Sequence, residues 1–226
     1  MPIKSSGAGR LKEINRWDGS VSWLAYPDEG MQRASHVLAV GDEAWVVDPV
    51  DVSGVDDLIA TVGDVAGVVV CLDRHKRDAA AVARRHDVPV YVPEWMTGVA
   101  SKLDAPTERF GRELDETGYR SITVLDRSFP AWQEAALYHD ETGTLLVPEA
   151  VGTAEFFRAP GERLGVHPML RPLPPKGAFR GLDPERVFVG HGEGVFDDAA
   201  TALHDALDNA RSRLPGAYLK AFRSVL

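Results

Sequence analysis

The sequence predicts a single α/β domain, and three observations support this fold class. The chain has 226 residues, which is enough for one sizeable hydrophobic core. Two pairs of strand-like runs are each separated by a short turn sequence, as in β-hairpins. Between the pairs, residues 67–92 predict a buried strand, a polar loop, a helix and a second strand. The predicted order is therefore hairpin, β-α-β unit, hairpin, and finally a strand followed by a helix.

The amino-acid composition indicates to which broad class of protein the chain belongs. Apolar residues make up 44% of the chain and charged residues 26%, which is typical of a globular protein. No apolar run approaches the roughly 20 residues of a membrane helix, and the N-terminal residues lack a signal-peptide core, so we expect a cytoplasmic protein without membrane contact. The net charge of −9 argues against nucleic-acid binding. The single cysteine, Cys71, excludes an internal disulfide.

The N-terminal third predicts a mobile start followed by strands. Residues 1–10 are expected to be flexible, and a strand follows over residues 21–26. Two further strand-like runs, over residues 35–40 and 43–48, flank Gly41-Asp42, which is a strong hairpin signal. A helical segment is expected near residues 54–62.

The middle third contains the β-α-β unit. Residues 67–72 are apolar and largely β-branched, which is typical of a strand covered on both faces. The alanine-rich run over residues 79–86 predicts a helix, and Asp78 directly before it could accept hydrogen bonds from the first helical N–H groups. A strand over residues 88–92 completes the unit. A short helix is expected over residues 95–102, and residues 105–119 are expected to be irregular or to form an edge.

The C-terminal half returns to strands. These are expected over residues 121–125, 134–139 and 144–147, the last two joined as a hairpin by the turn sequence 140–143. The region 148–181 is rich in proline and glycine and predicts a long loop, and such loops are often functional.

A strand over residues 186–189 leads into Gly190-His191-Gly192. Helical spacing then runs from Asp197 to Leu214, with Pro215-Gly216 as the expected stop and residues 218–226 as a terminal helix or tail. Leu203, Leu207 and Leu214 could face either the core or a homodimer interface.

The order of elements, the polar loop after the buried strand and the Gly-His-Gly segment together resemble the metallo-β-lactamase fold superfamily over about residues 21–214. This resemblance implies an αββα sandwich, in which two mixed β-sheets pack face to face with helices outside and a metal site lies along one edge. Asp48 matches the aspartate that ends a strand in typical members. Glu149 stands where members carry a metal-bridging carboxylate, and His191 matches their final ligand histidine.

The loop over residues 73–78 departs from the family's Thr-His-x-His-x-Asp-His motif. Asp73 takes the position of the first motif histidine and His75 that of the second. Arg77 replaces the motif aspartate, and Asp78 replaces the last histidine. The histidine that members usually carry after residue 125 is missing from residues 126–133.

The resemblance implies a metal-dependent hydrolase with an altered, carboxylate-containing site that acts on a small, anionic molecule. Asp73, His75 and His191 would hold one divalent ion, either Zn, Mn or Fe, which could supply hydroxide for hydrolysis. Glu149 would orient the attacking water, with Asp78 as a second catalytic carboxylate.

The alternative is a metal-free pseudoenzyme. A fixed guanidinium at Arg77 repels a dication, so Arg77 could occupy the former metal site. Arg74, Lys76 and Arg77 precede a predicted helix N-terminus and would then bind an anion. The other histidines are expected to be structural or exposed, although His167 belongs to the long loop that is expected to overhang the site; they are His36, His86, His139, His167 and His204.

Overall fold

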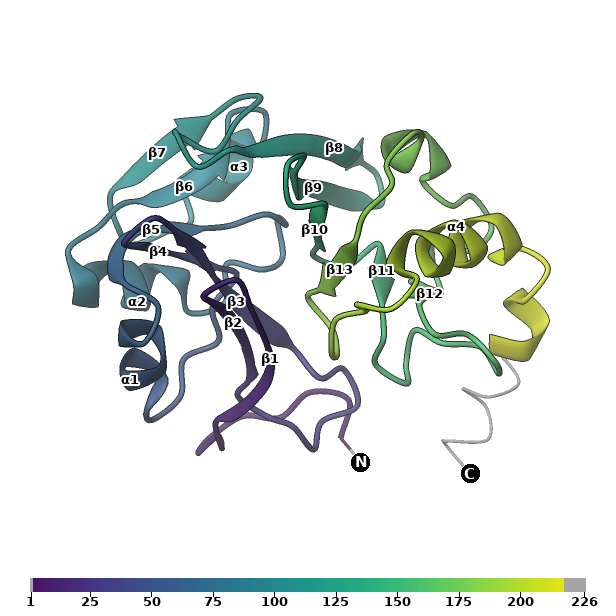
Figure 1. Ribbon diagram of the computed structural model, residues 1–226, viewed down its shortest axis with the longest axis horizontal. Helices are drawn as coiled ribbons and strands as arrows, with labels where there is room; N and C mark the ends of the chain where they lie inside the picture. Colours follow the sequence, from purple (N-terminus) through teal and green to yellow (C-terminus); the bar gives the residue numbers. More distant parts are fainter. Residues whose placement is uncertain (1, 218–226) are drawn as a thin grey trace.

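Two mixed β-sheets form the centre of the molecule in a computed structural model that describes residues 2–217 (Figure 1). The larger sheet has seven strands in chain order; they are β1 (Lys12–Trp17), β2 (Ser20–Leu24), β3 (Ala34–Val40), β4 (Glu43–Val47), β5 (Asp64–Val69), β6 (Val90–Pro93) and β7 (Thr107–Phe110). Pairing is antiparallel from β1 to β4 and parallel from β4 to β7.

The smaller sheet has four strands in the order β13-β10-β9-β8; they are β13 (Arg186–Val189), β10 (Thr144–Val147), β9 (Ala131–His139) and β8 (Tyr119–Ser128). Pairing is parallel only between β10 and β13. A separate two-stranded ribbon joins β11 (Val151–Gly152) to β12 (Gly165–Val166). The helices are α1 (Val55–Ala60), α2 (Ala79–His86), α3 (Thr97–Ala100), the 3₁₀ turn η1 (Lys176–Phe179) and α4 (Ala199–Asn209).

Successive apolar side chains of a strand lie in different apolar layers, of which the molecule has three main ones. Val69 packs between the sheets with Leu146 and Phe188, whereas its neighbour Val68 faces the layer that contains α1 and α2. On β13, Phe188 lies between the sheets while Val187 packs with α4. Successive side chains of a strand point to opposite faces, so the period-2 pattern builds the αββα sandwich that the sequence predicted.

The chain crosses from one sheet to the other directly before the polar loop. β5 ends at Val69 rather than at residue 72. The amide of Ala135 on β9 donates to the carbonyl of Cys71 at 2.8 Å, and the amide of Asp73 donates to the carbonyl of Gln133 at 3.0 Å. These bonds fix residues 73–78 at the edge where the two sheets meet.

The main sequence predictions are confirmed. The β3–β4 and β9–β10 hairpins form, and β5, α2 and β6 make a parallel β-α-β unit. β7 is the edge strand of its sheet, in the segment predicted to be irregular or an edge. The sequence did not predict β1.

The predicted end of the last helix was wrong. α4 ends at Asn209, but residues 214–217 are helical again, so Pro215-Gly216 does not stop the helix there. Proline is tolerated in the first turn of a helix because its missing N–H has no intrahelical partner at that point. Leu203 and Leu207 belong to the core. The tail predicted over residues 218–226 lies outside the described residues.

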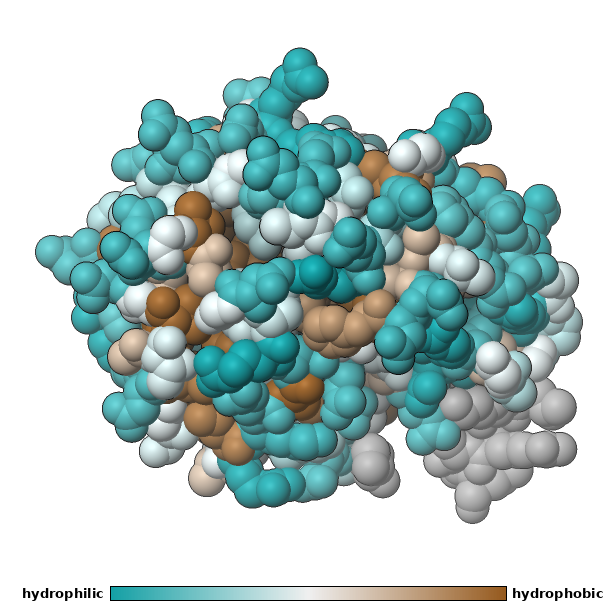
Figure 2. All heavy atoms as spheres, viewed as in Figure 1, coloured by the Kyte–Doolittle hydropathy of each residue, from teal (hydrophilic) through white to brown (hydrophobic). Residues whose placement is uncertain are grey.

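On the face seen in Figure 2, hydrophilic residues cover most of the surface, and apolar residues lie in patches between them. No helix in residues 2–217 is long and apolar enough to cross a membrane.

Candidate functional site

The candidate site lies where four strands end. Asp48 follows β4, His75 lies in the loop beyond β5, Glu149 follows β10 and His191 follows β13. β4 is parallel to β5, and β10 is parallel to β13, so the carboxyl ends of each pair lie at the same edge of their sheet. The topology therefore brings together side chains that are more than 100 residues apart in the chain.

Three of these side chains form a group with the geometry of a metal site. His75, Glu149 and His191 each offer a ligand atom, and these atoms lie within 4.8 Å of one another. All three residues are buried, with at most 7% of their surface exposed. Two histidines and a glutamate are a donor set known from catalytic zinc sites.

Hydrogen bonds fix the same tautomer in both histidines. Nδ1 of His191 lies 2.9 Å from the carbonyl oxygen of Met31, to which it must donate. Nδ1 of His75 lies 3.0 Å from Oδ2 of Asp48 and donates to that carboxylate. Both Nε2 atoms are therefore free of a proton in the neutral ring, as in metal-ligating histidines whose other nitrogen is held by a carboxylate or carbonyl.

Burial keeps both rings neutral. It holds the pKa of His75 and of His191 well below the ordinary value, and the positive charge of Arg77 acts in the same direction. Nε2 of His191 is buried and has no hydrogen-bond partner. This lone pair is an acceptor without a donor, which is uncommon in a protein interior.

Glu149 is held between two cationic or donor groups. Its Oε2 accepts a hydrogen bond of 2.9 Å from Nη2 of Arg74, whose guanidinium lies over the ring of Trp132 at 4.1 Å. Burial opposes ionisation of Glu149, but the charge and the hydrogen bond of the Arg74 guanidinium hold the pKa of this carboxyl below its ordinary value. Oε1 lies 3.8 Å from Nε2 of His167.

His167 comes from the long loop, directly after β12, and presents one defined nitrogen to Glu149. The amide of Met169 donates to its Nδ1 at 3.2 Å, so the proton of the neutral ring resides on Nε2 and faces the carboxylate. Burial lowers the pKa of His167 to about 4. The expected overhang of this loop places His167 beside the site.

Arg77 fills the side of the cluster next to the larger sheet. Its Nη1 donates to the carbonyls of Ala34 at 2.6 Å and of Asp48 at 2.8 Å. Its Nη2 lies 3.2 Å from both the carbonyl of Gly190 and Nε2 of His75. Burial lowers the pKa of Arg77 to about 10, which leaves the guanidinium charged at neutral pH.

The other predicted site residues lie outside the three-residue group. Asp73 is partly buried, and its Oδ1 has no hydrogen-bond partner. Asp78 occupies the N-cap position of α2, but its side chain makes no bond to the helix, so that prediction was wrong. Its Oδ2 instead accepts from the amide of Asp51 at 2.9 Å, which ties the loop to the end of β4.

The three basic residues of the loop point to different partners. Arg74 reaches Glu149, Lys76 bonds to the carbonyl of Asp73, and Arg77 is committed to the carbonyl groups described above. Each of the three side chains therefore has a partner within the protein.

Sequence reasoning missed Glu134, whose carboxylate accepts hydrogen bonds from the amides of Glu149 and Ala150, and the carbonyl of Met31, which accepts from His191. The residue pattern of β9 does not predict a buried carboxylate at Glu134. The role of a backbone carbonyl cannot be predicted from residue types, because every residue has one. His167 could be found only through its position in the proline-rich loop.

The donor set fits one metal ion better than two. Nε2 of His191 is a buried acceptor without a hydrogen-bond partner, and both ligand histidines have the tautomer that a metal requires. The place of the motif aspartate, by contrast, is taken by the guanidinium of Arg77. No second group of three or more metal-ligating side chains lies close together in residues 2–217.

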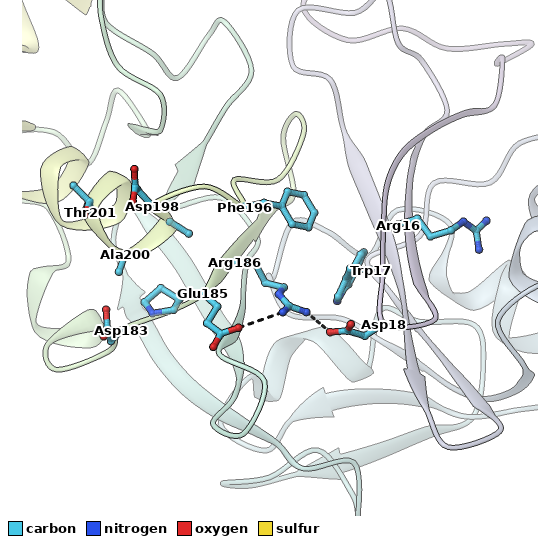
Figure 3. Close-up of a pocket in the computed structure, with 12 residues that line it drawn as sticks. Arg16, Trp17, Asp18, Asp183, Glu185, Arg186, Phe196, Asp198, Ala200 and Thr201 are labelled. Atoms are coloured by element: carbon cyan, nitrogen blue, oxygen red, sulfur yellow. Dashed lines mark hydrogen bonds and ion pairs between the residues drawn. The ribbon is translucent and has the colours of Figure 1, made fainter.

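A cleft of about 680 Å³ lies at the other end of β13 (Figure 3). Arg186, the first residue of β13, reaches between Asp18 and Glu185 in this cleft. His191 follows the opposite end of the same strand, and no residue of the three-residue group lines the cleft.

No family model and no curated protein matches the sequence. Several solved structures match the fold. The structure of the DIM-1 metallo-β-lactamase is 11% identical with a TM-score of 0.62, and the match covers 91% of this chain and 100% of that one. Metallo-β-lactamases from Erythrobacter litoralis (11% identity, TM-score 0.56, 90% and 99% covered) and Hirschia baltica (11%, 0.58, 93% and 97%) are similar to the same extent. The chain therefore has the metallo-β-lactamase fold.

Proposed function

We propose that this chain is a hydrolase that holds a single divalent metal ion between His75, Glu149 and His191. The observation that carries the proposal is the buried, unpartnered Nε2 of His191, which lies within ligand range of the other two side chains. A lone pair that is desolvated and unpaired costs about 1–3 kcal/mol, and an ion would satisfy it.

The charges around the group favour a cation. Four carboxyl groups lie in or beside it, together with the two guanidinium groups of Arg74 and Arg77; the carboxyl groups are Asp48, Asp73, Glu134 and Glu149. Burial raises the pKa of Asp48 to about 6 and that of Glu134 to about 7, and a cation in the group would favour the ionised form of both.

Arg77 opposes a second ion more strongly than a first. At about 4 Å and an effective dielectric constant of about 20, a dication and a guanidinium repel each other by about 8 kcal/mol. Because Nη2 of Arg77 lies 3.2 Å from Nε2 of His75, this repulsion also weakens binding of the first ion. A second ion would have to displace the guanidinium from the carbonyls of Ala34 and Asp48, whereas the first requires only that Nη2 release His75. The contact to be released, at 3.2 Å, is longer than the bonds of 2.6 and 2.8 Å to Ala34 and Asp48.

A bound ion of this kind lowers the pKa of water and polarises a substrate carbonyl or phosphoryl oxygen. In this arrangement, Asp48 orients His75 and Met31 orients His191 through their Nδ1 atoms. His167 presents its Nε2–H to Glu149, where it can hold or move a proton. The proposal gives Glu149 the ligand role that the sequence assigned to Asp73, and leaves Asp73 as a neighbouring carboxylate.

A second candidate is a metal-free protein in which Arg77 takes the place of the ion. The contact that favours it is the 3.2 Å separation between Nη2 of Arg77 and Nε2 of His75, because one lone pair cannot serve both a guanidinium and a metal. In this candidate, Arg77 ties the ends of β4 and β13 together as an ion would.

Elemental analysis separates the two candidates. The protein, purified without chelator and without a metal-binding tag, is incubated with Zn, Mn or Fe, desalted and analysed beside His191→Ala and the control His204→Ala. The single-ion proposal expects about one equivalent in the wild type and the control and at least a tenfold loss in His191→Ala. Absence of metal in a folded wild type, or full retention in His191→Ala, contradicts it.

A further inference from the structure

Glu134 is a fully buried carboxylate beside the site with no salt-bridge partner in the described part of the chain. It lies on β9, and its Oε1 accepts hydrogen bonds of 2.7 Å from the amides of Glu149 and Ala150. Its Oε2 accepts a third, also of 2.7 Å, from Nε1 of Trp132. Three N–H donors converge on one acceptor group, and each donor belongs to a residue in or beside the site.

We propose that Glu134 is the positioning residue for Glu149, which it fixes from two directions; this inference rests on the proposed function of Glu149 as a metal ligand. The first direction is the backbone. Glu149 follows Pro148 at the point where β10 has ended, so no sheet partner holds its amide. The bonds to Oε1 replace that partner and set the direction in which the Glu149 side chain leaves the backbone.

The second direction runs through two side chains. Oε2 of Glu134 holds the indole of Trp132, the guanidinium of Arg74 lies 4.1 Å over that indole, and Nη2 of Arg74 donates to Oε2 of Glu149. The contacts form a closed ring from Glu134 through Trp132, Arg74 and Glu149 back to Glu134. Both the backbone and the carboxylate of Glu149 are therefore set by one buried group.

A glutamine cannot replace Glu134 fully. A carboxylate accepts at both oxygens, whereas a glutamine has one acceptor and one NH₂ donor. If the glutamine oxygen keeps the two amides, its NH₂ group faces the N–H of Trp132, and the indole loses its partner. The isosteric change therefore opens the ring of contacts while keeping the side-chain volume, which favours a folded variant.

The test compares Glu134→Gln with Glu141→Gln, the same chemical change at an exposed position in the turn after β9. NMR measures hydrogen exchange at the amides of Glu149 and Ala150 and at the indole N–H of Trp132, without any metal. We expect exchange at least tenfold faster in Glu134→Gln than in the control at one or more of these sites. Unchanged exchange at all three overturns the positioning role.

A double-mutant cycle then tests the link to the metal. Outer contacts of metal ligands are typically worth 10–100-fold in affinity, so Glu134→Gln should raise the dissociation constant for Zn by at least tenfold. In a Glu149→Ala background the same change should have less than a twofold effect. A similar loss in both backgrounds means that Glu134 does not act through Glu149 and overturns the inference.

The two readouts separate this inference from the proposed function. If the wild type binds no metal, the hydrolase proposal fails, and the exchange measurement alone decides whether Glu134 positions Glu149. If metal binds and depends on His191 but exchange is unaffected by Glu134→Gln, the hydrolase proposal stands and the positioning inference fails.

Discussion

The two sheets contribute unlike halves to the same site. The half that follows the larger sheet contains Asp48, His75 and Arg77, and every one of these side chains bonds to another group of that half or to a strand end. The half that follows the smaller sheet contains Glu149, His167 and His191, and one of its atoms, Nε2 of His191, has no partner. In the first half the unpartnered buried atom of these side chains is a donor, Nε of Arg77, whereas in the second half it is an acceptor, Nε2 of His191.

This difference coincides with the departure from the motif that the sequence resembles. In the loop of the larger sheet, Arg77 stands at the position of the motif aspartate. In the smaller-sheet half, Glu149 and His191 match positions of that motif. Changes in the larger-sheet half should therefore alter metal affinity mainly through the charge of Arg77, whereas changes at His191 or Glu149 in the other half should remove a ligand.

The largest expected effect comes from Arg77→Met. Removing the guanidinium relieves its repulsion of a dication, so the dissociation constant for Zn should fall at least about a hundredfold, which corresponds to about 2.7 kcal/mol. The carbonyls of Ala34 and Asp48 lose their donor, so the free energy of unfolding should fall by about 3 kcal/mol. Metal titration and urea unfolding measure the two quantities. An unchanged affinity for Zn would mean that the guanidinium of Arg77 does not repel an ion bound at the three-residue group.

A comparable effect on stability is expected from pH, through His36 on β3. Burial, with help from Arg77, lowers the pKa of His36 from 6.5 to about 4 although Asp48 opposes the shift. His36 binds a proton below about pH 6.5 in the unfolded chain, but only below about pH 4 in the folded chain. Stability is therefore complete above pH 6.5 and lost as the pH falls toward 4, by at most roughly 3 kcal/mol.

Urea unfolding across this pH range checks the prediction. His36→Gln should reduce the dependence of the unfolding free energy on pH, with His86→Gln, a partly exposed histidine on α2, as the control. Equal slopes in the wild type and His36→Gln would assign the dependence to other groups.

The smallest effect is expected from Asp78→Ala. Its Oδ2 accepts one hydrogen bond from the amide of Asp51, in a partly exposed environment, so the free energy of unfolding should fall by about 1 kcal/mol. Because Asp78 lies outside the three-residue group, the dissociation constant for Zn should change by less than twofold. A tenfold weaker affinity for Zn would mean that Asp78 contributes to the metal site, and that the site extends into the loop of the larger sheet.

Much of the fold could be predicted because it follows from turn sequences and apolar runs that span only a few residues. The Gly41-Asp42 turn determines a hairpin, and the apolar run ending at Leu72 determines a buried strand. β1 was missed because four of its six residues are polar and only Trp17 is buried, so no apolar alternation marks it. The helical turn at Pro215 was missed because proline both ends one helix and begins another.

The candidate site could be predicted only in part. His75, Glu149 and His191 were found because each follows a recognisable strand and matches a family position. That Glu149, and not Asp73, lies within 4.8 Å of the two histidines was not predictable, because which carboxylate faces them depends on where β10 ends relative to β5. The same holds for Arg77, whose long side chain could have pointed to solvent.

The sequence by itself determined the order of strands and helices, the fold class and the loops that carry polar side chains. These follow from hydrophobic periodicity and turn chemistry, which act over a few residues. Only the tertiary structure decided that Arg77 turns inward to three carbonyls, that Met31 fixes the tautomer of His191 and that Glu134 holds Glu149. These contacts join residues up to 160 positions apart, and their energies depend on burial, which no local pattern contains.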